Sequence, residues 1–150
     1  MSLLNLQVGP GYFAVQNPLR LLERWLHGFR HSRTLRINQR EVEVSWTNRA
    51  ERELQRCEQG LVVELQLYFS CVVKKRVLFH RHSVQFDSVA VNDKMALAFQ
   101  PIASAACDPL EFATSYPPGK NLSAGRAARM VPRVVEIDYR QGNWEGQFLY

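Results

Sequence analysis

The chain has 150 residues, of which 46% are hydrophobic and 22% are charged, and its formal net charge is +5. These values are typical of a single globular domain over residues 1–150 and argue against an intrinsically disordered chain. No apolar run approaches the roughly 20 residues that span a bilayer, so we expect no membrane segment. The three cysteines form no CxxC pair and the first residues lack a signal-peptide pattern, which predicts a cytoplasmic protein with reduced thiols.

The first predicted element is a helix that begins at Asn17–Pro18 and runs to about Phe29. Proline suits the first helical position, because the N–H that it lacks has no partner there. Apolar residues recur at the spacing of one helix face: Leu22, Trp25, Leu26 and Phe29. Basic residues lie near the opposite side: Arg20, Arg24 and His27. We therefore expect this helix to pack one face and to expose a basic one.

From Thr34 the apolar period changes to two, which predicts a β-hairpin up to Trp46 with its turn at residues 38–40. Thr47 or Asn48 is suited to cap a second helix, predicted over Arg49–Gln59 and ended by Gly60. This helix carries a second basic row: Arg49, Arg52 and Arg56.

Alternation is clearest after Gly60, where apolar residues occupy every second position from Leu61 to Val73. The pattern predicts a strand with one face in the core. We expect a turn at Lys74–Lys75, followed by a returning strand that carries His80 and His82.

The remainder of the chain is predicted as strands with short helices between them. Met95–Phe99 is predicted as a strand, 107–116 as one or two helical turns, 117–121 as a loop and 123–130 as a short helix. A final hairpin turns at 141–143 and ends at Tyr150. Together these elements predict an α+β fold, with a mainly antiparallel sheet of about seven strands and two to four helices packed on one face.

The two strand histidines project to the same face, so both are able to approach one metal ion. A metal site needs a third ligand, but no histidine follows His82, and the nearest downstream carboxylates are Asp87 and Asp93. Four basic residues also crowd the hairpin: Lys74, Lys75, Arg76 and Arg81. We interpret His80 and His82 first as packed sheet residues, second as an anion or partner contact and third as metal ligands. We accordingly predict no metal site, no cofactor and no catalytic residue.

Positive charge is concentrated in two regions. Residues 20–56 hold nine arginines against five glutamates, and residues 74–82 hold four Lys or Arg residues and no acidic one. Arginine is a common anchor at protein interfaces. We therefore predict a non-enzymatic binding or assembly module that contacts an acidic or mixed-charge protein partner through this Arg-rich surface. The predicted binding residues are Arg20, Arg24, His27, Arg49, Arg52, Arg56, Lys74, Lys75, Arg76, His80, Arg81 and His82.

Two alternative functions stay open. One is a protein that binds the RNA or DNA backbone, with Tyr68 or another strand aromatic stacking on bases. The other is a small-molecule or metal-dependent enzyme that uses the histidine pair. The enzyme requires a pocket that brings His80 or His82 near Cys107, Asp87 or Asp93. Self-association is also predicted, because the strand that ends at Tyr150 is suited to lie at a sheet edge and pair with a second copy as a homodimer.

Overall fold

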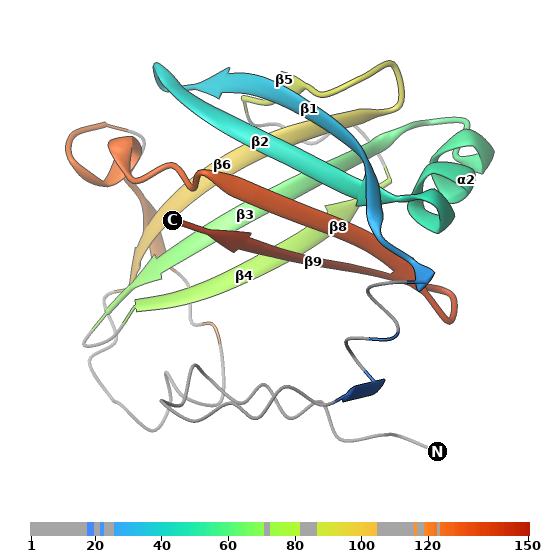
Figure 1. The fold of residues 1–150 in the computed structure, drawn as a ribbon. Helices are drawn as coiled ribbons and strands as arrows, with labels where there is room; N and C mark the ends of the chain where they lie inside the picture. Colours follow the sequence, from blue (N-terminus) through green and yellow to red (C-terminus); the bar gives the residue numbers. More distant parts are fainter. Residues whose placement is uncertain are drawn as a thin grey trace.

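The computed structural model describes residues 18–19, 22, 26–70, 73–81, 87–104, 116, 119–122 and 124–150. Within these ranges the chain is mostly β, and its two mixed sheets face each other across one core (Figure 1). The strands are β1 (Phe29–Ile37), β2 (Arg40–Thr47), β3 (Leu61–Phe69), β4 (Val73–His80), β5 (Val89–Ala90), β6 (Met95–Ser104), β7 (Gly119–Asn121), β8 (Val134–Arg140) and β9 (Asn143–Leu149). One complete α-helix, α2 (Asn48–Arg56), and one 3₁₀ turn, η1 (Ala127–Arg129), are also described.

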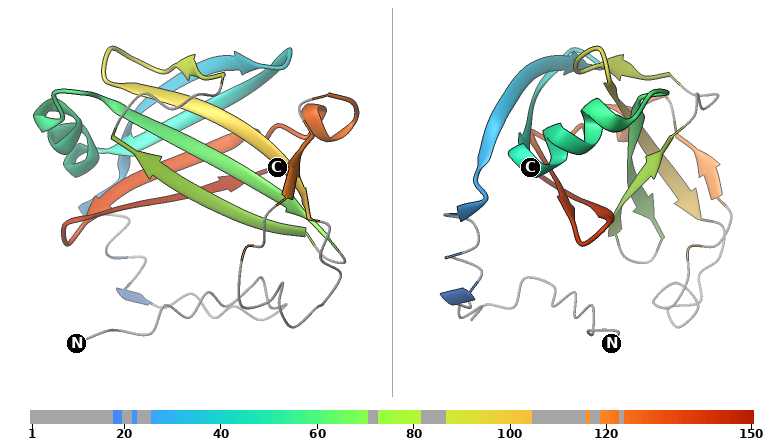
Figure 2. Two further views of the ribbon diagram at one scale, coloured as in Figure 1. Left: turned by 180° about the vertical axis from the view of Figure 1, so that it is seen from behind. Right: turned by 90° about the vertical axis from the view of Figure 1, so that its right-hand side faces the viewer.

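The four-stranded sheet has the order β1-β2-β8-β9, and the five-stranded sheet has the order β4-β3-β6-β5 with β7 also paired to β6. Paired strands that are consecutive along the chain run antiparallel. The two pairs of strands that are distant along the chain, β2 with β8 and β3 with β6, run parallel. The parallel pairs join distant segments, since Trp46 lies beside Ile137 and Phe69 beside Ala103. Figure 2 shows α2 across one end of the space between the sheets.

The core is built from the inward residues of both sheets. Alternation places Val42 and Val44 of β2, Val63 and Leu65 of β3 and Ile137 of β8 inside, each with no exposed surface. Burying a side chain of this size stabilises the fold by about 1.5–3 kcal/mol. Because one apolar cluster draws on both sheets, each sheet depends on the other for its buried face.

The β1–β2 hairpin follows from a two-residue turn. Asn38 and Gln39 both have positive φ values, 48° and 67°, which is the conformation of a type I′ hairpin turn. This turn matches the right-handed twist of the strands that it joins and sets Ile37 opposite Arg40. The predicted hairpin is confirmed, although its first strand begins earlier than expected, at Phe29.

α2 begins where the sequence predicted a cap. The Thr47 hydroxyl accepts a hydrogen bond from the Ala50 N–H at 3.2 Å, which satisfies one of the free donors of the first turn. Ala50 and Leu54 form the buried side of the helix. The chain then leaves through Gly60, whose φ of +75° favours glycine.

The open edges of the two sheets meet where β9 lies against β4. A Cβ added at Gly146 of β9 would lie 3.0 Å from the side chains of Phe79 and Val77 on β4, so glycine suits this close approach. The rings of Phe79 and Trp144 stack at 5.9 Å, and Lys75 Nζ donates to the Phe148 carbonyl at 3.3 Å. β9 therefore lies at a sheet edge, but β4 of the same chain packs against it. Its predicted pairing with a second copy stays a prediction.

The predicted fold class is correct only in part. The expected single, mainly antiparallel sheet is replaced by two mixed sheets, and the described ranges contain one complete α-helix where two to four were expected. The predicted 107–116 helix lies outside these ranges apart from Tyr116. The predicted 123–130 helix is reduced to the single 3₁₀ turn η1.

Three local predictions are also wrong. Lys74 and Lys75 lie within β4, not in a turn, and Gly119–Asn121 is a strand, not a loop. Leu22 and Leu26, which were expected to pack, are 53% and 55% exposed. Most of their predicted helix lies outside the described residues. No helix within the described ranges combines the length and the hydropathy needed to cross a membrane.

Candidate functional site

One face of the five-stranded sheet points away from the core and carries a row of polar side chains. The register sets Gln66 of β3 opposite Arg76 of β4, and Tyr68 opposite Lys74. Glu64 and Gln66 are only 6% and 7% exposed, although they face away from the core. Buried polar groups require hydrogen-bond partners, so this face is organised by its polar contacts.

These contacts form a continuous chain across β3 and β4. His80 Nε2 lies 2.7 Å from one Glu64 carboxylate oxygen, and the Gln66 side-chain amide donates to the other oxygen at 2.7 Å. The Nε–H of Arg76 donates to the Gln66 carbonyl oxygen at 2.8 Å. The orientation of the Arg76 guanidinium is thus fixed by a neutral side chain, which is itself held by Glu64.

The aromatic ring of Tyr116 also contacts Arg76. The guanidinium carbon of Arg76 lies 3.9 Å from the centre of the Tyr116 ring, and Lys74 Nζ lies 4.6 Å from the same centre. Tyr68 meets Tyr116 edge to face at 5.7 Å. Two cations therefore converge on one ring, which attracts them through its quadrupole but does not neutralise their charge.

No described Asp or Glu pairs with Arg76. Its Nε is used by Gln66 and one face of its guanidinium lies on Tyr116, which leaves the planar fork of Nη1 and Nη2 without an acidic partner in the described chain. Arginine presents this fork to carboxylate or phosphate oxygens in bidentate geometry. We define Arg76, Lys74, Gln66, Tyr116 and the His80–Glu64 pair as the Arg76 site.

A second arginine is held differently. Arg49, in the first turn of α2, donates to both oxygens of Asp138 on β8, from Nε at 2.7 Å and from Nη2 at 2.5 Å. The Thr47 hydroxyl donates to the same carboxylate at 2.5 Å. Burial by itself raises the pKa of Asp138, but the hydrogen bonds from Arg49, Thr47 and the Tyr139 N–H outweigh it and leave that pKa below its ordinary value. We call this group the Arg49 site; it attaches α2 to the four-stranded sheet.

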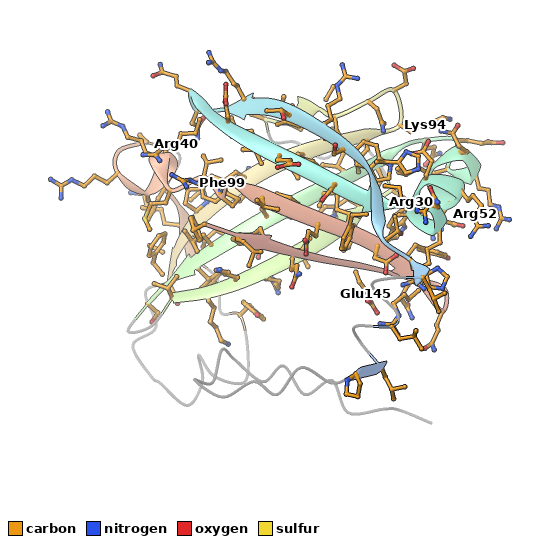
Figure 3. All side chains as sticks on the ribbon, in the orientation of Figure 1. Arg30, Arg40, Arg52, Lys94, Phe99 and Glu145 are labelled. Carbon is orange, nitrogen blue, oxygen red and sulfur yellow. The ribbon has the colours of Figure 1, made fainter. Side chains whose placement is uncertain are left out.

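The other predicted binding residues do not gather at one place. On α2, Arg52 is exposed, and the exposed Arg56 forms an ion pair with Glu53 at 3.7 Å. Figure 3 shows Arg52 on the outer side of the helix. Lys75 projects to the opposite side of β4, with its ammonium over the rings of Phe148 and Tyr150. His27 and Arg81 are exposed. Arg20, Arg24 and His82 lie outside the described residues.

The described residues contain only some of the groups that the enzyme alternative requires, namely His80, Asp87 and Asp93. His80 pairs with Glu64, whereas Asp87 lines a cavity of about 380 Å³ with Asn38 and Gln100. His82 and Cys107 lie outside the described residues. Within the described ranges, no cluster of three or more His, Cys, Asp or Glu side chains is placed to hold a metal ion.

The sequence missed the residues that orient Arg76. Gln66 was visible only as a polar position between apolar ones, and nothing in the local pattern brings Tyr116 to β4. Tyr68 was considered as a base-stacking residue, but it is only 2% exposed and its ring packs on Tyr116. It therefore has no free face for a base.

Comparison with known proteins adds no family. No family model, curated protein or solved structure matches this chain. The functional argument accordingly depends on the geometry above.

Proposed function

We propose that the protein is a non-enzymatic binding module that contacts an acidic or mixed-charge protein partner through the Arg76 site. The observation that carries this proposal is the partly buried Arg76 guanidinium, oriented by Gln66 and Tyr116 and without an acidic partner in the described chain. An arginine fixed before binding loses little side-chain entropy when a carboxylate arrives. Partial burial also strengthens the ion pair that forms there.

A protein carboxylate fits this site better than a nucleic acid. Nucleic-acid binding without sequence motifs relies on an extended basic groove and on aromatic faces open to bases. At the Arg76 site, Tyr68 is buried and the Tyr116 ring already receives two cations.

NMR signals of the arginine side chains test this proposal directly. In ¹⁵N-labelled protein, the Nε–Hε signals would be recorded during titration with a short Glu-Glu peptide and, separately, with a single-stranded oligonucleotide. We expect the peptide to shift the Arg76 signal at low salt, and Arg76→Gln to weaken peptide binding by about tenfold, the loss of one charge-assisted contact. Arg52→Gln is the matched control, since it removes the same charge from an exposed helix position.

Two outcomes would overturn the proposal. One is an Arg76 signal that stays fixed while the peptide binds elsewhere or fails to bind. The other is an Arg76 signal that moves only with the oligonucleotide, which would establish the nucleic-acid alternative.

A further inference from the structure

Within the part of the chain that the structure describes, the outer edge of β1 is open. β1 is nine residues long and stands at the end of its sheet, and no strand in the described chain pairs with its outer side. β5 comes near it at the hairpin end, where Val89 and Ile37 line the same cavity. The other end of β1 extends beyond that contact, down the right-hand side in Figure 1 and along the left margin in the right-hand view of Figure 2.

The register shows which backbone groups point outward. In a two-residue hairpin turn, the Ile37 carbonyl faces the Arg40 N–H, and hydrogen-bonded pairs then alternate along the ladder. Thr34 and Glu43 consequently form a pair without mutual hydrogen bonds. The Glu43 N–H confirms this assignment, because it donates to the Arg133 carbonyl, away from β1, at 2.8 Å. The N–H and C=O groups of Ser32, Thr34 and Arg36 are therefore directed to the open edge.

This edge carries a uniform charge. Arg30, Arg33 and Arg36 are all exposed along β1, and β1 holds no acidic residue. Of these three arginines, only Arg36 forms an ion pair with a described residue, Glu41, at 3.4 Å. Both side chains of that pair are mostly exposed, at 74% and 68%, so it holds Arg36 weakly. Figure 3 shows Arg30 and Arg40 at opposite ends of the β1–β2 hairpin.

We propose that the outer edge of β1 binds an extended acidic segment of a partner protein, which adds a strand to the four-stranded sheet. The outward N–H and C=O groups of β1 supply the ladder, and its arginines select glutamate or aspartate on the incoming strand. A second copy of β1 is disfavoured as the occupant, because it would set the same three arginines of each copy along one ladder. This surface lies on the four-stranded sheet, whereas the Arg76 site lies on the five-stranded sheet, so the two proposals use different residues.

The test uses two peptides of equal length, one alternating Glu with Val and one alternating Lys with Val. We expect only the Glu peptide to bind. Amide hydrogen exchange followed by NMR then locates the ladder: the Thr34 and Arg36 amides should become protected on peptide binding. The Arg33 and Leu35 amides already donate to β2 and should change little.

Variants separate strand addition from simple charge attraction. Thr34→Pro removes an outward N–H without touching the β1–β2 ladder, so it should abolish binding of the Glu peptide, whereas Thr34→Ala should retain it. Arg33→Glu should weaken binding by about tenfold, and Arg52→Glu on α2 should not. A circular dichroism spectrum equal to that of the natural protein would show that Thr34→Pro is folded.

The proposal fails if the Glu peptide does not bind, or if it binds Thr34→Pro as well as Thr34→Ala. It also fails if binding protects no amide on β1. Because Arg76→Gln leaves this edge intact, a loss of Glu-peptide protection on β1 in that variant would likewise contradict it.

Discussion

Arg49 and Arg76 show two uses of the same side chain. Both are partly buried, and both donate from Nε to an oxygen on a neighbouring strand. Arg49 closes on the Asp138 carboxylate with two hydrogen bonds, whereas Arg76 contacts a neutral amide and an aromatic ring. The Asp138 carboxylate neutralises the charge of Arg49 within the fold, whereas Gln66 and Tyr116 orient the guanidinium of Arg76 without neutralising its charge.

The difference separates stability from binding. Removing one partner of a paired, partly buried charge leaves the other uncompensated, which strongly destabilises a fold. Arg76 has no acidic partner in the described chain, so its removal leaves no buried counter-charge there and costs mainly its hydrogen bond to the neutral Gln66. We therefore expect the Arg49 site to matter for folding and the Arg76 site for contact with a partner. The predictions below test this contrast, from the largest expected effect to the smallest.

The largest effect is expected from Asp138→Asn. The substitution keeps the size of the side chain but leaves Arg49 without its counter-charge, so the free energy of unfolding should fall by about 2–3 kcal/mol. Urea denaturation measures this change. Glu136→Gln, on the same strand and bonded to Gln147 at the surface, is the control and should cost under about 0.5 kcal/mol. Equal losses in the two variants would contradict the structural role of the Arg49 site.

A related effect depends on pH. The pKa of folded Asp138 lies below its ordinary value of 3.8, so its contribution to stability is present above that value and is lost as the pH falls through the folded pKa. The difference in unfolding free energy between the natural protein and Asp138→Asn should therefore narrow as the pH is lowered below about 4. Urea denaturation at a series of acidic pH values measures it. A difference that stays constant across the series would contradict this assignment.

A smaller effect is expected when each arginine is replaced by lysine. Arg49→Lys loses the bidentate geometry with Asp138 and should cost about 1–2 kcal/mol. Arg76→Lys retains a charge and a donor for Gln66, so it should cost under about 1 kcal/mol. Thermal denaturation of the two variants, each compared with the natural protein, measures these two losses of stability. A reversed order would show that the Arg76 site supports the fold more than the Arg49 site does.

The sequence predicted the local elements better than their assembly. Alternation identified both hairpins and the inward face of β3, because burial of one face leaves a period of two. It did not predict the parallel pairs β2–β8 and β3–β6, since pairing between distant strands leaves no local pattern. The turn placed at Lys74–Lys75 was wrong because β4 continues through both lysines, and no glycine or proline near Ser70 marks the true turn.

The candidate site was predicted even less completely. The sequence nominated Lys74, Arg76 and His80 from local charge, but it could not distinguish them from Arg49 or Arg56, which pair with acidic side chains. That distinction depends on cross-strand register and on Tyr116, which lies far along the chain. The arginines of β1 were also missed as a group, because the helical spacing of residues 22–29 extended the predicted helix to the first residue of that strand.

The most direct test of the account measures stability and binding together in Arg49→Gln and Arg76→Gln. In Arg76→Gln the introduced amide keeps a donor for Gln66, so we expect a loss of about 1 kcal/mol or less in unfolding free energy, with binding of the Glu-Glu peptide weakened by about tenfold. In Arg49→Gln we expect the reverse, a loss of about 2–3 kcal/mol with peptide binding retained. The account is contradicted if Arg76→Gln is destabilised as much as Arg49→Gln and binds the peptide as tightly as the natural protein.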